Sequence, residues 1–221
     1  MKLLLNALIK FICGLLLVGL LIFLPAGTFN YIGGWTFLGL LFVPIFVMGI
    51  VLLLKAPDLL KKRLDGKEKE NTQKSVVAFS ALIFITGFVI AGLDFRFGWS
   101  NVPTTVVIIA SVLFLVAYGL YAEVMRENAY LSRTIEVQEN QKVIDTGLYS
   151  VVRHPMYMAT ILLFLMIPII LGSWYAFIIF LAYPIIIALR IKNEEQVLTE
   201  QLDGYAEYKQ KVKYRIIPFV W

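Results

Sequence analysis

Charge, cysteine and histidine are all scarce in this sequence. Only 16% of the 221 residues are charged and 60% are hydrophobic, whereas about a quarter of the residues in soluble domains are charged. This composition excludes an ordinary soluble domain, and equally a disordered or fibrous chain. Cys13 is the only cysteine and His154 the only histidine. No disulfide can therefore form within the chain, a zinc site built from cysteine and histidine is excluded, and we expect no metal site.

Long apolar runs take the place of charge. A helix needs about 20 residues to cross a bilayer core of about 30 Å. The candidate stretches run near Leu3–Leu24, Trp35–Leu54, Val76–Leu93, Val106–Glu123, Met156–Leu171 and Trp174–Leu189. The fifth is short and contains Pro168, so we expect it to be tilted or kinked. Gly172-Ser173 allows only a tight helical hairpin. We predict an all-α polytopic membrane protein with about six transmembrane helices.

The basic residues gather on alternate connections between these stretches. They are Lys2, Lys10, Lys55, Lys61, Lys62, Arg63, Lys67, Lys69, Lys74, Arg126, Arg133, Lys142, Arg153, Arg190, Lys192, Lys209, Lys211, Lys213 and Arg215. The opposite connections contribute only Arg96. By the positive-inside rule, both termini and both long loops are expected in the cytoplasm, at the inner membrane if the cell is bacterial. We attribute the net charge of +5 to these loops and expect no nucleic-acid partner.

The polar residues concentrate in two segments on the predicted cytoplasmic side, 126–155 and 190–221. We expect a single membrane domain over residues 1–221, with transmembrane helices in 1–125 and a catalytic half in 126–221. The span interiors are nearly free of ionisable groups. Asp94 is the exception, and we interpret it, with Arg96 close by, as a local structural pair at the membrane edge.

The first of two polar motifs, Gly147–Tyr157, immediately precedes the last helical hairpin. Pro155 favours the first turn of the following helix, and His154 then occupies the cap position. Backbone N–H groups at such a helix end have no partner in their own helix, and they can bind an anionic group of a ligand. Taken alone, the motif could equally be an ordinary membrane-entry segment.

The second motif, Arg190–Leu198, follows the hairpin. Arg190 and Glu194 are four residues apart, so they share one face of a helix. Two functions are open for Arg190: it could pair with Glu194, or it could face a substrate, which we favour. We interpret Lys192 and Glu195 as ordinary charged residues of an exposed helix end. Because the hairpin is tight, the two motifs are expected to meet at one membrane edge.

Together the motifs resemble those of the isoprenylcysteine carboxyl methyltransferase family and, more broadly, of the membrane methyltransferases that include phospholipid N-methyltransferases. The pattern Gly-x-Tyr-x-x-x-Arg-His-Pro-x-Tyr is followed by Arg-x-x-x-Glu-Glu-x-x-Leu, Tyr-x-x-Tyr and a terminal Ile-Pro. The resemblance covers about residues 134–221 and implies a membrane enzyme that uses S-adenosylmethionine. The implied cofactor-binding residues are Gln138, Gln141, Lys142, Val143, Ile144, Tyr149, His154, Pro155, Met156, Tyr157 and Glu194, and the implied substrate-orienting residue is Arg190.

The residue types suit this chemistry independently of the family. Glu194 can hold an ammonium group or ribose hydroxyls, while His154 and helix-end N–H groups can hold a carboxylate. A sulfonium can be stabilised over an aromatic face, and the candidates are Tyr149, Tyr157, Tyr205 and Tyr208.

The acceptor is expected to be a lipophilic molecule, or a lipidated one, that enters from the bilayer among membrane lipids. As the group that accepts the methyl, we expect first a carboxyl group, as in an isoprenylcysteine. An amine headgroup is the second, and it would need a base such as His154 or a tyrosine. Departures from the family pattern, such as Leu202-Asp203-Gly204 in place of the usual Phe-Gly, leave the acceptor open. A non-enzymatic lipid-binding or assembly protein and a nicotinamide-dependent reductase are the other classes considered.

Overall fold

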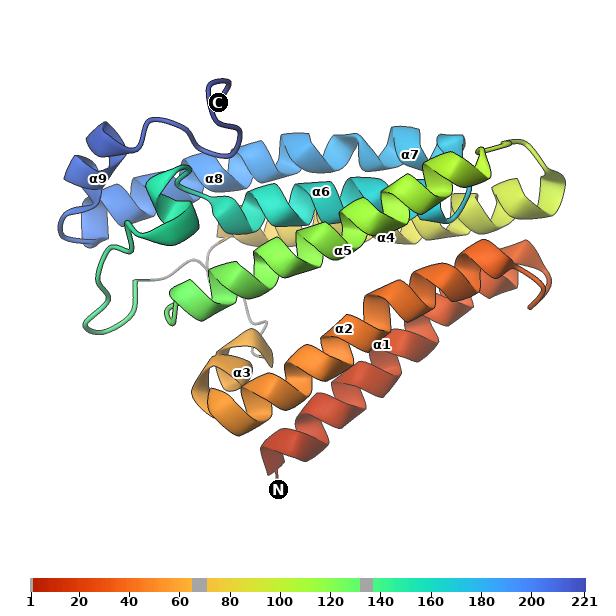
Figure 1. The fold of residues 1–221 in the computed structure, drawn as a ribbon, viewed down its shortest axis with the longest axis horizontal. Coiled ribbons are helices and arrows are strands. Elements are labelled where there is room, and N and C mark those ends of the chain that lie inside the picture. The colour runs from red at the N-terminus through yellow and green to blue at the C-terminus, as the bar shows by residue number, and fades with distance from the viewer. Residues whose placement is uncertain (1, 65–70, 132–136) are drawn as a thin grey trace.

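Helices make up the regular structure of the protein (Figure 1). The computed structural model describes residues 2–64, 71–131 and 137–221. Lys67, Lys69 and Arg133, which entered the prediction of orientation, lie outside the described residues. The elements are α1 (Lys2–Ala26), α2 (Ile32–Lys55), α3 (Pro57–Leu64), α4 (Asn71–Phe97), α5 (Thr104–Glu127), the 3-10 helix η1 (Gly147–Ser150), α6 (Pro155–Ile170), α7 (Trp174–Phe180), α8 (Ala182–Gln201) and α9 (Tyr205–Lys211).

Five helical units in the described residues are long and apolar enough to cross a membrane: α1, α2, α4, α5 and the continuous unit Trp174–Gln201, formed by α7 and α8. The apolar helix α6 has only 16 residues and rises about 24 Å. Each of the six predicted stretches therefore corresponds to a helix, with the fifth shorter than the others as expected. The prediction of an all-α polytopic membrane protein is confirmed.

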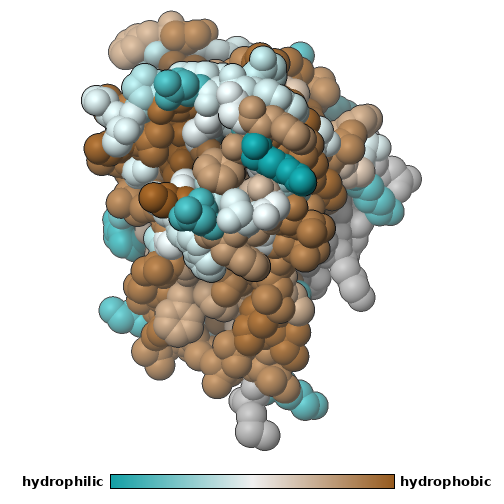
Figure 2. All heavy atoms as spheres, turned by 90° about the vertical axis from the view of Figure 1, so that its right-hand side faces the viewer, coloured by the Kyte–Doolittle hydropathy of each residue, from teal (hydrophilic) through white to brown (hydrophobic). Residues whose placement is uncertain are grey.

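Large apolar side chains cover the outside of the helices, as expected when the surrounding solvent is lipid rather than water. Leu16, Leu24 and Leu54 are 65%, 70% and 77% exposed. Figure 2 views the end of the bundle where α1 meets α2, α4 meets α5 and α6 meets α7, and it shows apolar surface with scattered hydrophilic residues. The helices alternate in direction, so α3, α9 and the segment between α5 and α6 lie at the opposite end (Figure 1).

The tight hairpin between α6 and α7 is present as predicted. Gly172 follows the last turn of α6 with a φ of 77°, a backbone conformation that glycine adopts without steric cost. Ser173 then caps α7, since its side-chain oxygen accepts a hydrogen bond from Ala176 N at 3.0 Å. Two residues with these conformations are enough to reverse the chain.

Asp94 has the expected structural function but different partners. It is 1% exposed and accepts hydrogen bonds from the backbone N–H and the hydroxyl of Ser100, both at 2.6 Å, and from the hydroxyl of Ser173. Arg96 is exposed, and its guanidinium lies 5.6 Å from the ring centroid of Phe97. The predicted pairing of Asp94 with Arg96 is therefore corrected. The carboxylate joins the α4–α5 connection to the α6–α7 turn.

Helices α1 and α4 pack closely at a glycine. A Cβ atom added to Gly92 of α4 would lie 2.5 Å from the carbonyl oxygen of Ile22 in α1. Small residues at such positions allow helix backbones to approach each other in membranes, where dispersion contacts rather than the hydrophobic effect drive helix association. The first helix is thereby held against the body of the bundle.

Candidate active site

The two sides of the hairpin, α6 and the continuous unit of α7 and α8, differ in length, and this difference creates one wall of the site. The arm after the turn, Trp174–Gln201, has 28 residues and α6 has 16, so α8 continues past the start of α6 by roughly twelve residues, or about 18 Å. The apolar stretch was predicted to end near Leu189 with the motif from Arg190 still helical, and the helix continues to Gln201. The extra turns carry Arg190 and Glu194 past the cap of α6, where His154 occupies the N-cap position and Pro155 the first turn, as predicted.

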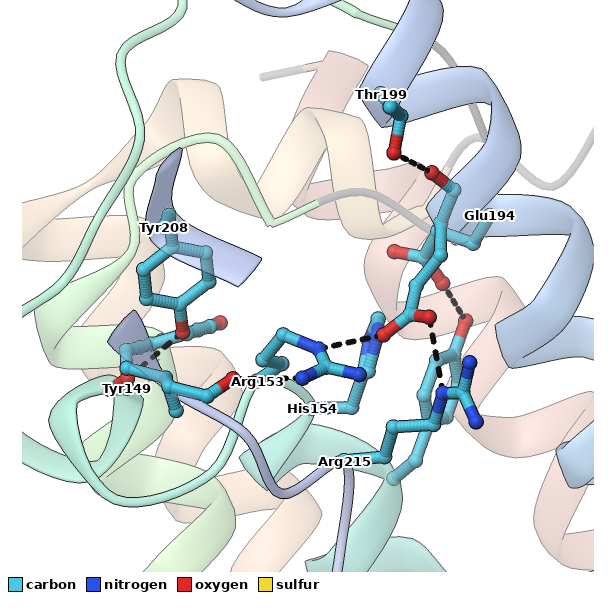
Figure 3. Close-up of polar contacts among 10 residues, drawn as sticks. Tyr149, Arg153, His154, Glu194, Thr199, Tyr208 and Arg215 are labelled. Carbon is cyan, nitrogen blue, oxygen red and sulfur yellow. Dashed lines mark hydrogen bonds and ion pairs between the residues drawn. The ribbon is translucent and has the colours of Figure 1, made fainter. Parts of the chain in front are cut away.

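The C-terminal tail folds back over the same place. The backbone N–H of Arg153 donates to Tyr214 O at 2.9 Å, and that of His154 donates to Arg215 O at 2.8 Å. Nearby, the hydroxyl of Tyr208 donates to Tyr149 O at 2.7 Å (Figure 3). These contacts close the polar end of the bundle around a pocket.

The pocket lies between the segment after α5, the first turn of α6, the end of α8 and α9. The cavity has a volume of about 110 Å³. In the part of the chain that the structure describes, its lining is Asn128, Tyr130, Leu131, Gln141, Lys142, Val143, Ile144, Tyr149, Arg153, His154, Met156, Tyr157, Arg190, Glu194, Leu198, Leu202, Tyr205 and Tyr208.

Ten of the twelve predicted site residues line this pocket, and their individual functions remain predictions. Gln138 and Pro155 are absent from the described lining. Pro155 is fully buried in the first turn of α6. The side-chain amide of Gln138 donates to the backbone of the lining residue Tyr130, at 2.6 Å from its carbonyl oxygen.

Arg190, Tyr157 and Glu194 form one hydrogen-bonded chain. Arg190 Nε donates to the hydroxyl of Tyr157 at 2.8 Å, and this hydroxyl donates to Glu194 Oε2 at 2.6 Å. Arg190 and Tyr157 are buried, and Glu194 is partly exposed. The tyrosine therefore connects the two residues that sequence spacing had placed on one helix face. It fixes one oxygen of the carboxylate on the pocket side.

Glu195 was interpreted as an ordinary residue of an exposed helix end, and this interpretation is wrong. Its carboxylate is 3% exposed and accepts from Arg153 Nε at 2.6 Å and Arg215 Nε at 2.9 Å, with His154 Nε2 at 3.2 Å. Figure 3 shows these three basic side chains converging. Because an ionised carboxylate only accepts hydrogen bonds, Nε2 of His154 carries the proton in this contact. Glu195 thus joins α8 to the cap of α6 and to the tail.

A contact from the N-terminal half supports the loop that carries Gln141. Lys62 in α3 donates to Gln138 Oε1 at 2.5 Å, and the backbone N–H of Gln138 donates to Gln141 Oε1 at 2.9 Å. Leu59 of α3 is buried in one cluster with Tyr149. Helix α3 lies in a segment that the sequence analysis treated only as a basic connection. It forms part of the support of the pocket.

Replacing Lys62 with methionine is expected to loosen this loop. The variant loses one hydrogen bond, worth about 1 kcal/mol, so amide exchange at Gln138 and Gln141 should accelerate about five- to tenfold. Hydrogen exchange with mass spectrometry on the purified protein measures this. The matched control is Lys61→Met, one residue earlier and exposed. Equal exchange rates in the two variants would show that Lys62 does not support the loop.

Cations outnumber anions on the pocket wall. Lys142 and Arg190 face it, against the carboxylate of Glu194, while the charge of Arg153 is paired with Glu195 at 2.6 Å. Burial raises the pKa of Tyr149 to about 12. The phenol of Tyr149 therefore stays neutral in the physiological range and adds no negative charge.

Sequence reasoning missed several lining residues. Arg153 directly precedes His154 in the first motif, so the motif itself was a usable signal. Tyr205 and Tyr208 had been considered for their aromatic faces but were not assigned to the site. The apolar lining residues Leu131, Leu198 and Leu202 had no distinguishing sequence signal, because apolar residues are common throughout this chain.

Comparison with known families agrees with the motif resemblance. Residues 105–204 match the model of the family described as phospholipid methyltransferase. No curated protein matches the chain. The matched segment runs from the start of α5 past the end of α8, and it contains every pocket residue except Tyr205 and Tyr208. Through this segment the chain is similar to the phospholipid methyltransferase family, and the match supports a methyltransferase with several membrane-spanning helices.

Proposed function

We propose that the pocket binds S-adenosylmethionine and that the protein transfers its methyl group to a lipophilic acceptor, first of all a carboxyl group such as that of an isoprenylcysteine. The observation that carries the choice of acceptor is the surplus of cationic side chains around the pocket, Lys142 and Arg190 against Glu194, since the charge of Arg153 is already paired with Glu195. An anionic acceptor is attracted to such a wall, and a cationic amine is repelled.

The residues present fit this cofactor. Glu194 offers a carboxylate to an ammonium group or to ribose hydroxyls, and the first turn of α6 offers N–H groups to a carboxylate. The hydroxyl of Tyr205 is buried in the lining without a partner among the described residues. Ligand pockets usually measure 300–1,000 Å³, so a cavity of about 110 Å³ must widen to hold the whole cofactor.

The cofactor supplies an electrophilic methyl group, and the protein supplies position. A carboxylate acceptor is already nucleophilic at neutral pH and needs no base. The planar guanidinium of Arg190 suits a carboxylate, because its parallel N–H groups can bind both oxygens. Tyr157 holds Arg190 and Glu194 together, which relates the acceptor and cofactor positions rigidly. In-line alignment of this kind supplies much of the rate in a direct displacement.

A phospholipid or other lipid amine is the second candidate acceptor, and the family match favours it. An amine must lose a proton before or during transfer. His154 was the candidate base, but its Nε2 is directed at the buried Glu195. A non-enzymatic lipid-binding protein is the third candidate. By the positive-inside rule we also propose that the pocket end and both termini face the cytoplasm.

Methyl-labelled cofactor distinguishes these functions. The purified protein is incubated with labelled S-adenosylmethionine and either N-acetyl-S-farnesylcysteine or vesicles of phosphatidylethanolamine. A methyl ester releases labelled methanol in mild base, whereas an N-methyl group does not. We expect base-labile label on the farnesylcysteine. Base-stable label on the phospholipid would replace the carboxyl proposal by the amine one, and no transfer together with no binding of S-adenosylhomocysteine would support the non-enzymatic protein.

A further inference from the structure

One hydroxyl group in the pocket has no hydrogen-bond partner within the described part of the protein. Tyr205 is 4% exposed, and its Oη is the buried side-chain atom there without a partner. Leaving a buried hydroxyl unpaired costs about 1–3 kcal/mol, so such groups in folded proteins call for a specific explanation. Tyr205 lines the pocket, and a molecule bound there can supply the missing acceptor.

The adjacent tyrosine shows what a purely structural hydroxyl does in the same place. Tyr208 lies one helical turn later in α9, and the two ring centroids are 5.7 Å apart. Both residues are buried and both line the pocket. The hydroxyl of Tyr208 is bonded to Tyr149 O at 2.7 Å. Similar surroundings therefore give one hydroxyl a partner and leave the other without one.

We propose that Tyr205 is a ligand-binding residue whose hydroxyl donates a hydrogen bond to the bound cofactor. This assignment rests on the proposed function. It goes beyond the family match, because the matched segment ends at residue 204. The side chain is suited to donate, since burial raises the pKa of Tyr205, and the Glu195 and Glu194 carboxylates raise it further. The hydroxyl therefore keeps its proton at neutral pH.

The test is a pair of tyrosine-to-phenylalanine variants with two readouts: the melting temperature of the ligand-free protein in detergent, and the Kd for S-adenosylhomocysteine. Tyr205→Phe removes an unpaired hydroxyl, so the melting temperature of the ligand-free protein should not fall. The Kd should rise about three- to tenfold, the value of one neutral hydrogen bond. Tyr208→Phe removes a bonded hydroxyl, so it should lower the melting temperature of the ligand-free protein.

Two results would overturn the assignment of Tyr205 without affecting the proposed function. One is a Kd for Tyr205→Phe equal to that of the wild type. The other is a fall in melting temperature as large as that of Tyr208→Phe, which would show that the hydroxyl of Tyr205 has a partner within the protein. If the wild type itself does not bind S-adenosylhomocysteine, the proposed function fails and the assignment fails with it. The wild-type measurement therefore separates the two failures.

Discussion

Replacing Glu195 with glutamine is expected to destabilise the pocket end of the protein by about 3–5 kcal/mol, the usual effect of removing one partner of a buried ion pair. The substitution keeps the shape of the side chain but removes its charge. Arg153, 8% exposed, and Arg215 then lose the carboxylate to which both donate. Thermal unfolding in detergent, followed by intrinsic fluorescence or circular dichroism, measures the loss.

The matched control is Glu200→Gln, on the same helix but exposed. Its carboxylate accepts a hydrogen bond from Gln196. Exposed contacts of this kind contribute little to the free energy of unfolding. We expect its melting temperature to stay close to that of the wild type. If Glu195→Gln and Glu200→Gln melt at the same temperature, the buried cluster does not hold the tail against α6 and α8.

Replacing Arg190 with alanine is expected to lower turnover about 100-fold or more, as the loss of one well-placed donor does in other enzymes. Binding of S-adenosylhomocysteine should change by less than about threefold, because Tyr157 still donates directly to Glu194 at 2.6 Å. Methyl transfer from labelled cofactor and calorimetric titration with S-adenosylhomocysteine give the two readouts. Arg190→Lys keeps the charge without the planar fork, and it should remain strongly impaired.

The competing possibility is that Arg190 acts only by holding the carboxylate of Glu194 in place. Tyr157→Phe then provides the decisive comparison, because it breaks the chain at its middle residue. If Arg190 merely supports Glu194, Arg190→Ala should weaken S-adenosylhomocysteine binding as much as Tyr157→Phe does. If Arg190 orients the acceptor, only Tyr157→Phe should weaken that binding appreciably.

Much of the fold could be predicted because the bilayer imposes simple rules on the sequence. Apolar runs long enough to span the bilayer predicted the helices, and Gly172-Ser173 predicted the tight hairpin. The ends of the helices were less predictable. Helix α8 continues to Gln201, well beyond the apolar stretch that ends near Leu189, and its polar last turns pack against the tail and the cap of α6. A hydropathy pattern detects where a helix leaves the apolar layer, not where it ends.

The motif residues of the pocket could be predicted because they recur in order around the hairpin. Glu195 could not, since its partners come from places remote in sequence: Arg153 precedes it by 42 residues and Arg215 follows it by 20. Only the return of the tail across α6 brings them together. For the same reason, no local pattern indicated that Lys62, 76 residues before Gln138, would support the pocket loop.

The most direct test of the account is the affinity of the Glu194→Gln variant for S-adenosylhomocysteine, measured beside the wild type by isothermal titration calorimetry in detergent. Glu194 lines the pocket, and Tyr157 holds one of its oxygens at 2.6 Å. Loss of a hydrogen bond to a charged group costs about 1.5–3 kcal/mol, so the Kd should rise about 10- to 150-fold, with little change in melting temperature. A variant that binds as tightly as the wild type, or a wild type that does not bind, would contradict the assignment of this pocket to the methyl donor.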